Sequence, residues 1–331
     1  MSVLVLDAKD KRILFELDLN GREFISNIAK KVGLSKEVVN YRIKRLQQND
    51  VIKGFGAVID PSKIGYRIYR IFIKYRDLSP ETEQKLLKHL KNHPNVGWVV
   101  TYEGFYDLVI LFWAKDIFSF REMCDGLFTE YGKYFQNIVT TVILNIYHFK
   151  HNFLFDSNDY NQIVIGGKVD SIELDEIDNE ILKILAEDCR NTTLNIGSKL
   201  NLPPNTVKYR IKRLIDNKVI VAFKTKIDVS TLGYQHYKVF LSLHQLTEKV
   251  RKDIIGFLKI NPNVVYVTDA LGHADLEFEA HVKNVKDIHF LIRSIKAQFP
   301  ETIKDSNATL VYKEHRINYL PSTNGKNKPL K

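Results

Sequence analysis

The sequence predicts an α+β protein built from two repeats, each a (winged) helix-turn-helix domain followed by a ferredoxin-like βαββαβ domain. Three observations lead to this prediction. The two halves of the chain resemble each other, and the start of each half spaces its apolar residues as helices do. The remainder of each half alternates between strand and helix patterns.

The duplication is visible when the two halves are aligned directly. The segment LDAKDKRILFEL at Leu6 recurs as LDEIDNEILKIL at Leu174, and the match continues without a gap. About 29 of the 67 positions from Leu6 to Phe72 are identical in the second copy. Both halves are therefore expected to share one architecture.

Turn-forming composition divides the chain into six segments. Gly166-Gly167 and the polar residues before it mark a linker, in which the apolar triplet IVI predicts a short strand. A second boundary falls near Gly65 and Gly233, where helical spacing gives way to strands. The predicted segments are a helix-turn-helix domain at 1–60, a ferredoxin-like domain at 61–151, a linker at 152–171, a second helix-turn-helix domain at 172–229, a second ferredoxin-like domain at 230–320 and a disordered tail at 321–331.

The helix-turn-helix prediction rests on capping residues near the start of each half. Asp7 is suited to cap a first helix that ends near Gly21. A short second helix is expected to stop at Gly33, and Ser35 is expected to cap a third. The apolar alternation over 51–59 then predicts a strand or wing.

The third helix has an outward basic face in both copies. Val39, Ile43 and Leu46 form one apolar stripe, and four cations against one Glu give residues 35–49 a charge of about +3. Such a face suits the phosphates and base edges of a DNA major groove. The predicted DNA-binding residues are Lys36, Asn40, Tyr41, Arg42, Lys44 and Arg45, with Asn205, Lys208, Tyr209, Arg210, Lys212 and Arg213 in the second copy.

Each of these residues has a structural alternative. A basic helix can simply be a solvated face, although two copies in the same context favour a functional role. Arg42 and Arg210 flank the apolar stripe, so they could instead pair with an acid inside the domain. Tyr41 and Tyr209 could stack on sugar or merely cover the helix.

The second domain of each half follows the ferredoxin-like order. The patterns predict strands at 68–74, 96–102, 105–114 and 138–147, a helix at 80–93 and a second helix containing Met123, Leu127 and Tyr131. The duplicate from 233 to 315 has the same pattern. A sheet covered by helices on one face must cover the other, so we expect the two ferredoxin-like units to associate within the chain or between chains. The aromatic residues that exceed the needs of one small sheet are Trp98, Phe105, Tyr106, Phe112, Trp113, Phe118 and Phe120.

Composition favours a polyanionic partner in the cytoplasm. The chain has 49 Lys and Arg against 39 Asp and Glu, a net charge of +10, although a lysine-rich solubilising surface is an alternative. Cys124 and Cys189 are far apart, which indicates neither a disulfide framework nor a thiolate zinc site. The apolar stretch 108–114 is too short to span a bilayer, and the start of the chain has no export pattern. We therefore expect no membrane association.

These motifs resemble the Lrp/AsnC (feast/famine) family of transcriptional regulators. The matching words are LDxxDxxILxxL, the V-x-x-RIKRL helix, VIKGFGAVID and the GY that follows. The resemblance covers nearly the whole chain twice, whereas ordinary members have one unit. It implies a sequence-specific regulator of transcription with double-stranded DNA as its partner. The tandem form leaves open a homo-oligomer or an intrachain pseudo-dimer.

The resemblance also implies an effector, such as an amino acid or another small molecule, in the second domain. The matching positions are Gly104, Asp107, Gly272 and Asp275, in the turns between the central strands. Glycine lets a ligand approach backbone amides, and an aspartate can receive an ammonium group. These residue types also occur in such turns for local geometry alone. The turns EGFYD and LGHAD differ, so the two halves need not bind the same effector.

The sequence does not predict an enzyme, a metal site or a cofactor. It has no phosphate loop, nucleophile elbow or metal-ligand spacing, and His148 and His151 are interpreted as isolated. Siroheme decarboxylases share the architecture, but their HNY...YNLWF stretch would align with WVVTYEGFYDLVILF, which lacks the histidine and the NLW. A protein that coats DNA without sequence choice is the other alternative.

Overall fold

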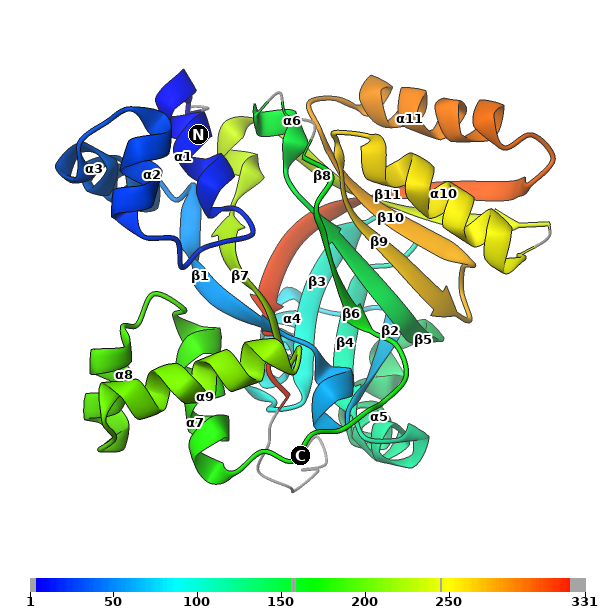
Figure 1. Ribbon diagram of the computed structural model, residues 1–331. Coiled ribbons are helices and arrows are strands. Elements are labelled where there is room, and N and C mark those ends of the chain that lie inside the picture. Colours follow the sequence, from blue (N-terminus) through cyan, green and yellow to red (C-terminus); the bar gives the residue numbers. More distant parts are fainter. Residues whose placement is uncertain (1–3, 156, 158, 245, 322–331) are drawn as a thin grey trace.

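The computed structural model describes residues 4–321 except 156, 158 and 245, and both halves have the predicted order of elements (Figure 1). The α+β fold class with two repeats is therefore confirmed. Apart from Pro321, the predicted disordered tail lies outside the described residues. The first half contains α1 (Ala8–Leu17), α2 (Ile25–Val32), α3 (Lys36–Gln48), β1 (Ile52–Ile59), β2 (Arg67–Tyr75), α4 (Pro80–Asn92), β3 (Val96–Glu103), β4 (Leu108–Ala114), α5 (Ile117–Tyr131) and β5 (Phe135–Phe149).

The second half repeats this order after a connecting segment. That segment contains α6 (Asn152–Phe155) and β6 (Gln162–Gly166), and β6 includes the predicted IVI strand. The second half contains α7 (Glu176–Glu187), α8 (Thr193–Leu200), α9 (Pro204–Asp216), β7 (Ile220–Ile227), β8 (Gln235–Leu243), α10 (Glu248–Ile260), β9 (Val264–Leu271), β10 (Leu276–Val282), α11 (Val285–Gln298) and β11 (Ile303–Ile317).

The predicted caps delimit the helices of the first domain. The Asp7 carboxylate accepts a hydrogen bond from the Asp10 backbone N–H at 2.7 Å and starts α1. Gly33 adopts a left-handed φ of +65° and ends α2, as a residue without Cβ does at low energy. The Ser35 hydroxyl accepts from Val38 N–H and starts α3. Helix α1 ends at Leu17, earlier than the sequence predicted.

The two ferredoxin-like units join into one closed ring of eight strands. Hydrogen-bonded neighbours follow the order β2-β4-β3-β11-β8-β10-β9-β5, and β5 also pairs with β2. The halves meet at β3–β11 and at β5–β9. Strands β5 and β11 are each 15 residues long; the N-terminal part of each pairs within its own half and the C-terminal part with the other half. The predicted association of the two units is thus confirmed within the chain.

The strand ring has two kinds of core. Outside it, α4 and α5 pack on the strands of the first half, and α10 and α11 pack on those of the second (Figure 1). Inside it, apolar side chains of the two halves meet. Of the aromatic residues noted above, Trp98, Tyr106 and Trp113 face the shared interior, Phe112 and Phe120 pack under helices, and Phe105 and Phe118 are exposed.

Each helix-turn-helix domain packs on strands of both halves. The predicted strand β1 is present, and it pairs antiparallel with β7, its equivalent in the other repeat (Figure 1). Phe223 and Ile227 of β7 contact the core of the first helix-turn-helix domain. Ala57 and Ile59 of β1 belong to the core of the second. This exchange holds both domains on the same side of the strand ring.

None of the helices in the described residues is both long and apolar enough to cross a membrane. Cys124 and Cys189 are buried and free. Burial raises the pKa of each thiol to about 12, so both are protonated at neutral pH and neither is a reactive thiolate.

Candidate nucleic-acid interface and interior cavity

Helix α3 presents the face that the sequence predicted. Val39, Ile43 and Leu46 are buried against α1, α2 and β1. The opposite side of the helix carries Lys36, Tyr41 and Lys44, which are exposed, with Asn40 half-buried beside them.

Helix α9 repeats the arrangement with different side chains. Val207, Ile211 and Leu214 are buried. Pro204 occupies the first helical turn, where its missing N–H leaves no intrahelical bond unmade. The exposed residues are Asn205, Lys208, Tyr209 and Lys212. Aligned on the repeat, Lys208 stands where α3 has Asn40, and Pro204 where it has Lys36.

The arginines of α3 and α9 that lie beside the buried stripe form ion pairs with acids of their own domain. Arg42 donates to Asp7 at 2.7 Å and to Asp10 at 2.8 Å, and Arg45 donates to Asp10 as well. The hydrogen bond from Arg42 lowers the pKa of Asp7. Asp10 is fully buried, so its charge needs these partners.

The second copy has the same pairs. Arg210 donates to Asp175 at 2.6 Å and to Asp178 at 2.9 Å, and Arg213 donates to Asp178. The structural alternative considered for Arg42 and Arg210 is therefore what the structure shows. These arginines join α3 to α1 and α9 to α7.

Among the described residues, three of the predicted lysines have no ion-pair partner. They are Lys36 and Lys44 on α3 and Lys208 on α9. Lys212 contacts Asp216 at 2.8 Å, but both side chains are exposed and such i,i+4 pairs contribute little. All four lysines are thus available to a polyanion.

Two arginines, one from each helix-turn-helix domain, each donate a hydrogen bond to a backbone carbonyl of the other domain. Arg22 donates to the Cys189 carbonyl at 2.6 Å and packs on the Phe223 ring, with 5.4 Å from its guanidinium carbon to the ring centroid. Arg190, its equivalent in the repeat, donates to the Gly21 carbonyl at 3.0 Å and packs on Phe55 at 5.0 Å. Because each contact has its twin, the two domains are held in one mutual orientation, related by a pseudo-two-fold axis.

The predicted effector residues lie in turns that their own contacts explain. Asp107 accepts from the Tyr75 backbone N–H at 2.7 Å and from Lys74 at 2.8 Å. Gly104 has a φ of +142°, and a Cβ there would lie 2.8 Å from the Thr309 hydroxyl. Because 104–107 form this turn, the strand predicted from 105 begins at Leu108.

The equivalent turn of the second half is built in the same way. Asp275 accepts from the Leu243 backbone N–H at 2.7 Å. Gly272 has a φ of +126°, and a Cβ there would lie 2.6 Å from the Thr140 carbonyl. In both halves the glycine lets the turn approach the last strand of the other half. These contacts match the local-geometry interpretation of the four residues.

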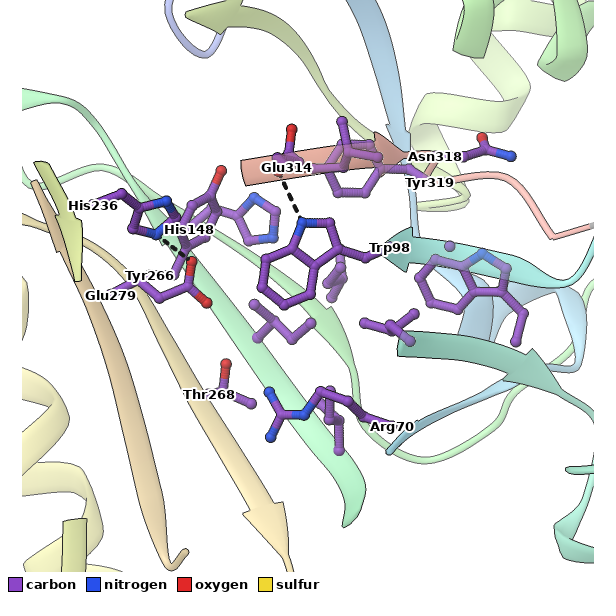
Figure 2. A pocket seen from close by; sticks show the side chains of 17 residues that line it. Arg70, Trp98, His148, His236, Tyr266, Thr268, Glu279, Glu314, Asn318 and Tyr319 are labelled. Atoms are coloured by element: carbon purple, nitrogen blue, oxygen red, sulfur yellow. Dashed lines mark hydrogen bonds and ion pairs between the residues drawn. The ribbon is translucent and has the colours of Figure 1, made fainter. Parts of the chain in front are cut away.

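A cavity opens inside the strand ring, away from these turns. It has about 600 Å³ of atom-free space, its mouth included, and its wall is mainly apolar. Figure 2 shows Trp98 and Arg70 pointing from the first half toward His236, Tyr266 and Glu279 of the second. At the mouth, the Trp98 indole donates to Glu314 at 2.8 Å.

A buried ion network forms part of this wall and continues behind it. Arg70 donates to Glu277, and Lys238 lies 2.9 Å from both Glu277 and Glu279. His236 contacts Glu279 at 2.9 Å. Arg70 and Lys238 occupy equivalent positions of β2 and β8, whereas Glu277 and Glu279 stand where the first half has Val109 and Leu111. The interior is therefore asymmetric.

The interpretation of His148 and His151 as isolated residues is wrong, because in the folded chain both lie against other aromatic side chains. The His151 ring stacks on His281 at 5.4 Å, and His281 meets His236 at 4.7 Å. His148 packs edge-on against Tyr266 at 4.8 Å. Residues distant in sequence meet because β5, β9, β10 and β8 are consecutive in the ring. Within the described residues, this gathering makes no group of three metal-ligating side chains.

Two of these histidines are expected to make the protein less stable in acid. Burial lowers the pKa of His148 and His281 well below its usual value, with neighbouring cations adding to the effect. Their contribution to stability is therefore full above about pH 6.5 and is lost as the pH falls toward the lowered value. We expect the free energy of unfolding to fall by up to about 1.4 kcal/mol per pH unit for each histidine below pH 6.5.

Urea unfolding at pH 7.5, 6.5 and 5.5 measures this dependence. His148→Gln should reduce the slope, whereas the exposed His289 provides a control, His289→Gln, that should leave it unchanged. Equal free energies of unfolding at the three pH values would contradict this account, in which the unfolded chain binds protons that the two buried histidines of the folded protein do not bind.

Comparison with known proteins assigns the class of the two small domains. The winged helix-turn-helix DNA-binding family matches residues 6–53 and again 174–221. The HTH-type transcriptional regulator LrpA of Pyrococcus horikoshii is 31% identical over 129 residues, which cover 39% of this chain and 88% of LrpA. The HTH-type transcriptional regulator FL11 of Pyrococcus furiosus is 35% identical over 114 residues, which cover 34% of this chain and 73% of FL11. The protein is thus a helix-turn-helix transcriptional regulator.

Its family follows from the same matches. The chain belongs to the Lrp/AsnC family of DNA-binding transcriptional regulators, in a tandem-duplicated form. A solved structure matches the whole duplicated architecture, the siroheme decarboxylase NirDL, with a TM-score of 0.63 over 95% of this chain and 94% of NirDL. Its sequence identity is 12%, so this likeness is one of fold alone.

Proposed function

We propose that this regulator recognises a specific double-stranded DNA sequence with α3 and α9 as a pair of recognition helices. The observation that supports the proposal is the reciprocal pair of contacts made by Arg22 and Arg190, which fix the orientation of the two domains relative to each other. In each domain, the basic face of α3 or α9 is exposed. Paired helix-turn-helix units bind two half-sites about one DNA turn apart. One chain therefore supplies both readers of a two-part site.

The two half-sites should differ. Bases are read by exposed side chains, and α3 offers Asn40 where α9 offers Lys208. Amide side chains favour adenine, and lysine favours guanine. Lys36 adds a cation at the start of α3 that Pro204 cannot supply on α9. The proposed operator is thus asymmetric rather than a perfect palindrome.

Selection of bound sequences from random duplex DNA at near-physiological salt tests the proposal. The matched control is the double variant Lys44→Ala, Lys212→Ala, which removes one exposed cation from each helix and leaves the arginine pairs with Asp10 and Asp178 in place. A defined motif that the double variant loses supports the proposal. Binding without a motif would indicate a protein that coats DNA without sequence choice.

The salt dependence of DNA affinity separates phosphate contacts from base reading. Each phosphate contact contributes about −0.9 to the slope of log affinity against log salt. If Lys44 and Lys212 both contact phosphates, the double variant should lower the magnitude of that slope by about 2. An unchanged slope, measured by fluorescence anisotropy between 50 and 200 mM salt, would mean that neither lysine contacts phosphate.

The whole-chain match to a siroheme decarboxylase motivates an enzymatic alternative. A related structure of that enzyme is a co-complex with an iron-uroporphyrin III analogue. Uroporphyrin carries several carboxylates, but the buried cations Arg70 and Lys238 already pair with Glu277 and Glu279. This pairing favours a non-enzymatic regulator, which we propose. A spectral shift of an added porphyrin, together with release of CO₂, would establish the enzyme instead.

A further inference from the structure

The interior cavity has the features of a ligand site rather than of a packing defect. Trp113 and His148 line it, and both side chains are almost fully buried. Among the described residues, Trp113 Nε1 and His148 Nδ1 have no hydrogen-bond partner. A buried polar nitrogen without a partner loses about 1–3 kcal/mol, so these two nitrogens favour a molecule that supplies the missing hydrogen bonds.

The charges of the wall indicate that this molecule is uncharged. Arg70 and Glu279 of the wall belong to one buried network with Lys238 and Glu277 behind them, which has two positive and two negative charges. The other carboxylate of the wall, Glu314, is exposed at the mouth. The charges of the buried network balance. A charged ligand would bring an unpaired charge into this interior, which is unfavourable, whereas an uncharged one would not.

The shape of the wall indicates an aromatic body. Trp98, Trp113, Tyr266 and Tyr319 all line the cavity, together with four Ile residues and one Leu. Aromatic rings in a protein interior pack well against other rings at an offset or edge-on. Ligand cavities in proteins are commonly lined in this way, with a few polar groups that set orientation.

The cavity wall is connected to the first helix-turn-helix domain. Lys224 of β7 donates to the Tyr266 hydroxyl and lies near the buried carboxylate of Asp18, where its charge helps to lower the pKa of that carboxyl. Asp18 follows the last residue of α1 and accepts from the His151 backbone N–H at 2.8 Å and the His151 ring at 2.9 Å.

The wall is also connected to the second domain. Asn318 and Tyr319 line the cavity, and the next residue, Leu320, packs in the core of the second helix-turn-helix domain. A displacement of this segment by a bound molecule would therefore reach α7 and α9. Each domain thus has its own connection to one shared cavity.

We propose that the cavity binds a small, uncharged aromatic molecule carrying a hydrogen-bonding oxygen or nitrogen, and that its binding changes DNA affinity through both domains. The first part of this proposal stands alone; the second rests on the proposed DNA-binding function. The site differs from the turns of Gly104 and Gly272, where the family resemblance implied an effector.

The chain contains two tryptophans, Trp98 and Trp113, and both line the cavity. Intrinsic tryptophan fluorescence therefore reports directly on occupancy of this site. Benzamide is the probe, with benzoate and benzylamine as anionic and cationic analogues of similar size. We expect a saturable fluorescence change with benzamide in the millimolar range, and at least tenfold weaker responses to both charged analogues.

A matched pair of variants separates the cavity from the rest of the molecule. Ile146→Phe adds an aromatic ring at a wall position and reduces the cavity. Ile260→Phe adds the same ring at an exposed position of α10. Benzamide affinity should fall at least tenfold in Ile146→Phe and stay unchanged in Ile260→Phe, with both variants melting within a few degrees of the wild type.

The outcomes distinguish the two parts of the proposal. No saturable response to benzamide, an equal response in Ile146→Phe, or tighter binding of a charged analogue overturns the ligand site. In parallel, saturating benzamide should change DNA affinity at least threefold in the wild type and leave it unchanged in Ile146→Phe. If benzamide binds saturably to the wild type but its DNA affinity stays the same, the regulatory part of the proposal is overturned. If the protein binds no DNA, the proposed function fails, and the fluorescence titration still decides the ligand site.

Discussion

Replacing Glu277 with alanine is expected to lower the free energy of unfolding by about 3–5 kcal/mol. Its carboxylate is fully buried and contacts both Arg70 and Lys238, which are themselves almost fully buried. Removal of the shared acid leaves Arg70 without an ion-pair partner among the residues that the structure describes, and Lys238 with Glu279 alone. Urea unfolding at pH 7.5 measures the change.

The first repeat suggests the control. Val109 occupies the position equivalent to Glu277, so the double variant Arg70→Met, Glu277→Val replaces the pair with apolar side chains and leaves Lys238 paired with Glu279. Such replacements are often neutral or stabilising. The double variant should therefore be more stable than Glu277→Ala. If Glu277→Ala remained within about 1 kcal/mol of the wild type, the buried network would not have the role assigned to it.

Asp178→Ala is expected to destabilise the second helix-turn-helix domain by about 2–4 kcal/mol and to weaken DNA binding at least tenfold. Asp178 is fully buried and receives Arg210 and Arg213 of α9. Both arginines are partly exposed, so the expected loss is smaller than for a fully buried pair. Without this acid, Arg213 loses its ion-pair partner among the described residues, and Arg210 keeps only the half-exposed Asp175.

Asp175 provides the matched control because it binds the same Arg210 but is half exposed. Asp175→Ala removes a helix cap and an exposed ion pair, and should lower stability by about 1 kcal/mol. Asp10→Ala and Asp7→Ala should show the same contrast in the first domain. Equal destabilisation by Asp178→Ala and Asp175→Ala would contradict this account of the buried acids.

Local structure could be predicted from the sequence because its causes are local. Asp7, Gly33 and Ser35 start and stop helices through contacts within three or four residues. The burial of Val39, Ile43 and Leu46 on one side of α3 could likewise be predicted from helical spacing alone. Duplication then extended each of these predictions to the second half.

Pairing between the halves could not be predicted in this way. The alternation of β1 suits a wing within one domain as well as the ribbon with β7 that the structure shows. The last strand was predicted at 138–147, and β5 extends from Phe135 to Phe149; its C-terminal part gains the pairing with β9. Strand patterns specify which face is buried, but not which strand lies alongside.

The sequence indicated ion pairs for Arg42 and Arg210 as an alternative, but the pairs of Arg45 and Arg213 were missed. Both repeats keep an aspartate at Asp10 and Asp178 together with an arginine at Arg45 and Arg213, which is the pattern of a retained pair. Glu277 and Glu279 had no such signal, because they alternate with apolar residues along β10 as on a strand with one solvent-facing side. The meeting of the histidines had no such signal, because it depends on the closure of the strand ring.

The most direct test of the central claim is DNA selection with two single variants, Asn40→Ala on α3 and Lys208→Ala on α9. If one chain reads an asymmetric operator with two different helices, each variant should relax base preference in one half-site and leave the other intact. The loss of discrimination should be about 1–3 kcal/mol at the affected base, roughly 5- to 150-fold. If both variants altered both half-sites equally, or if neither altered the selected sequence, α3 and α9 would not be the paired readers that we propose.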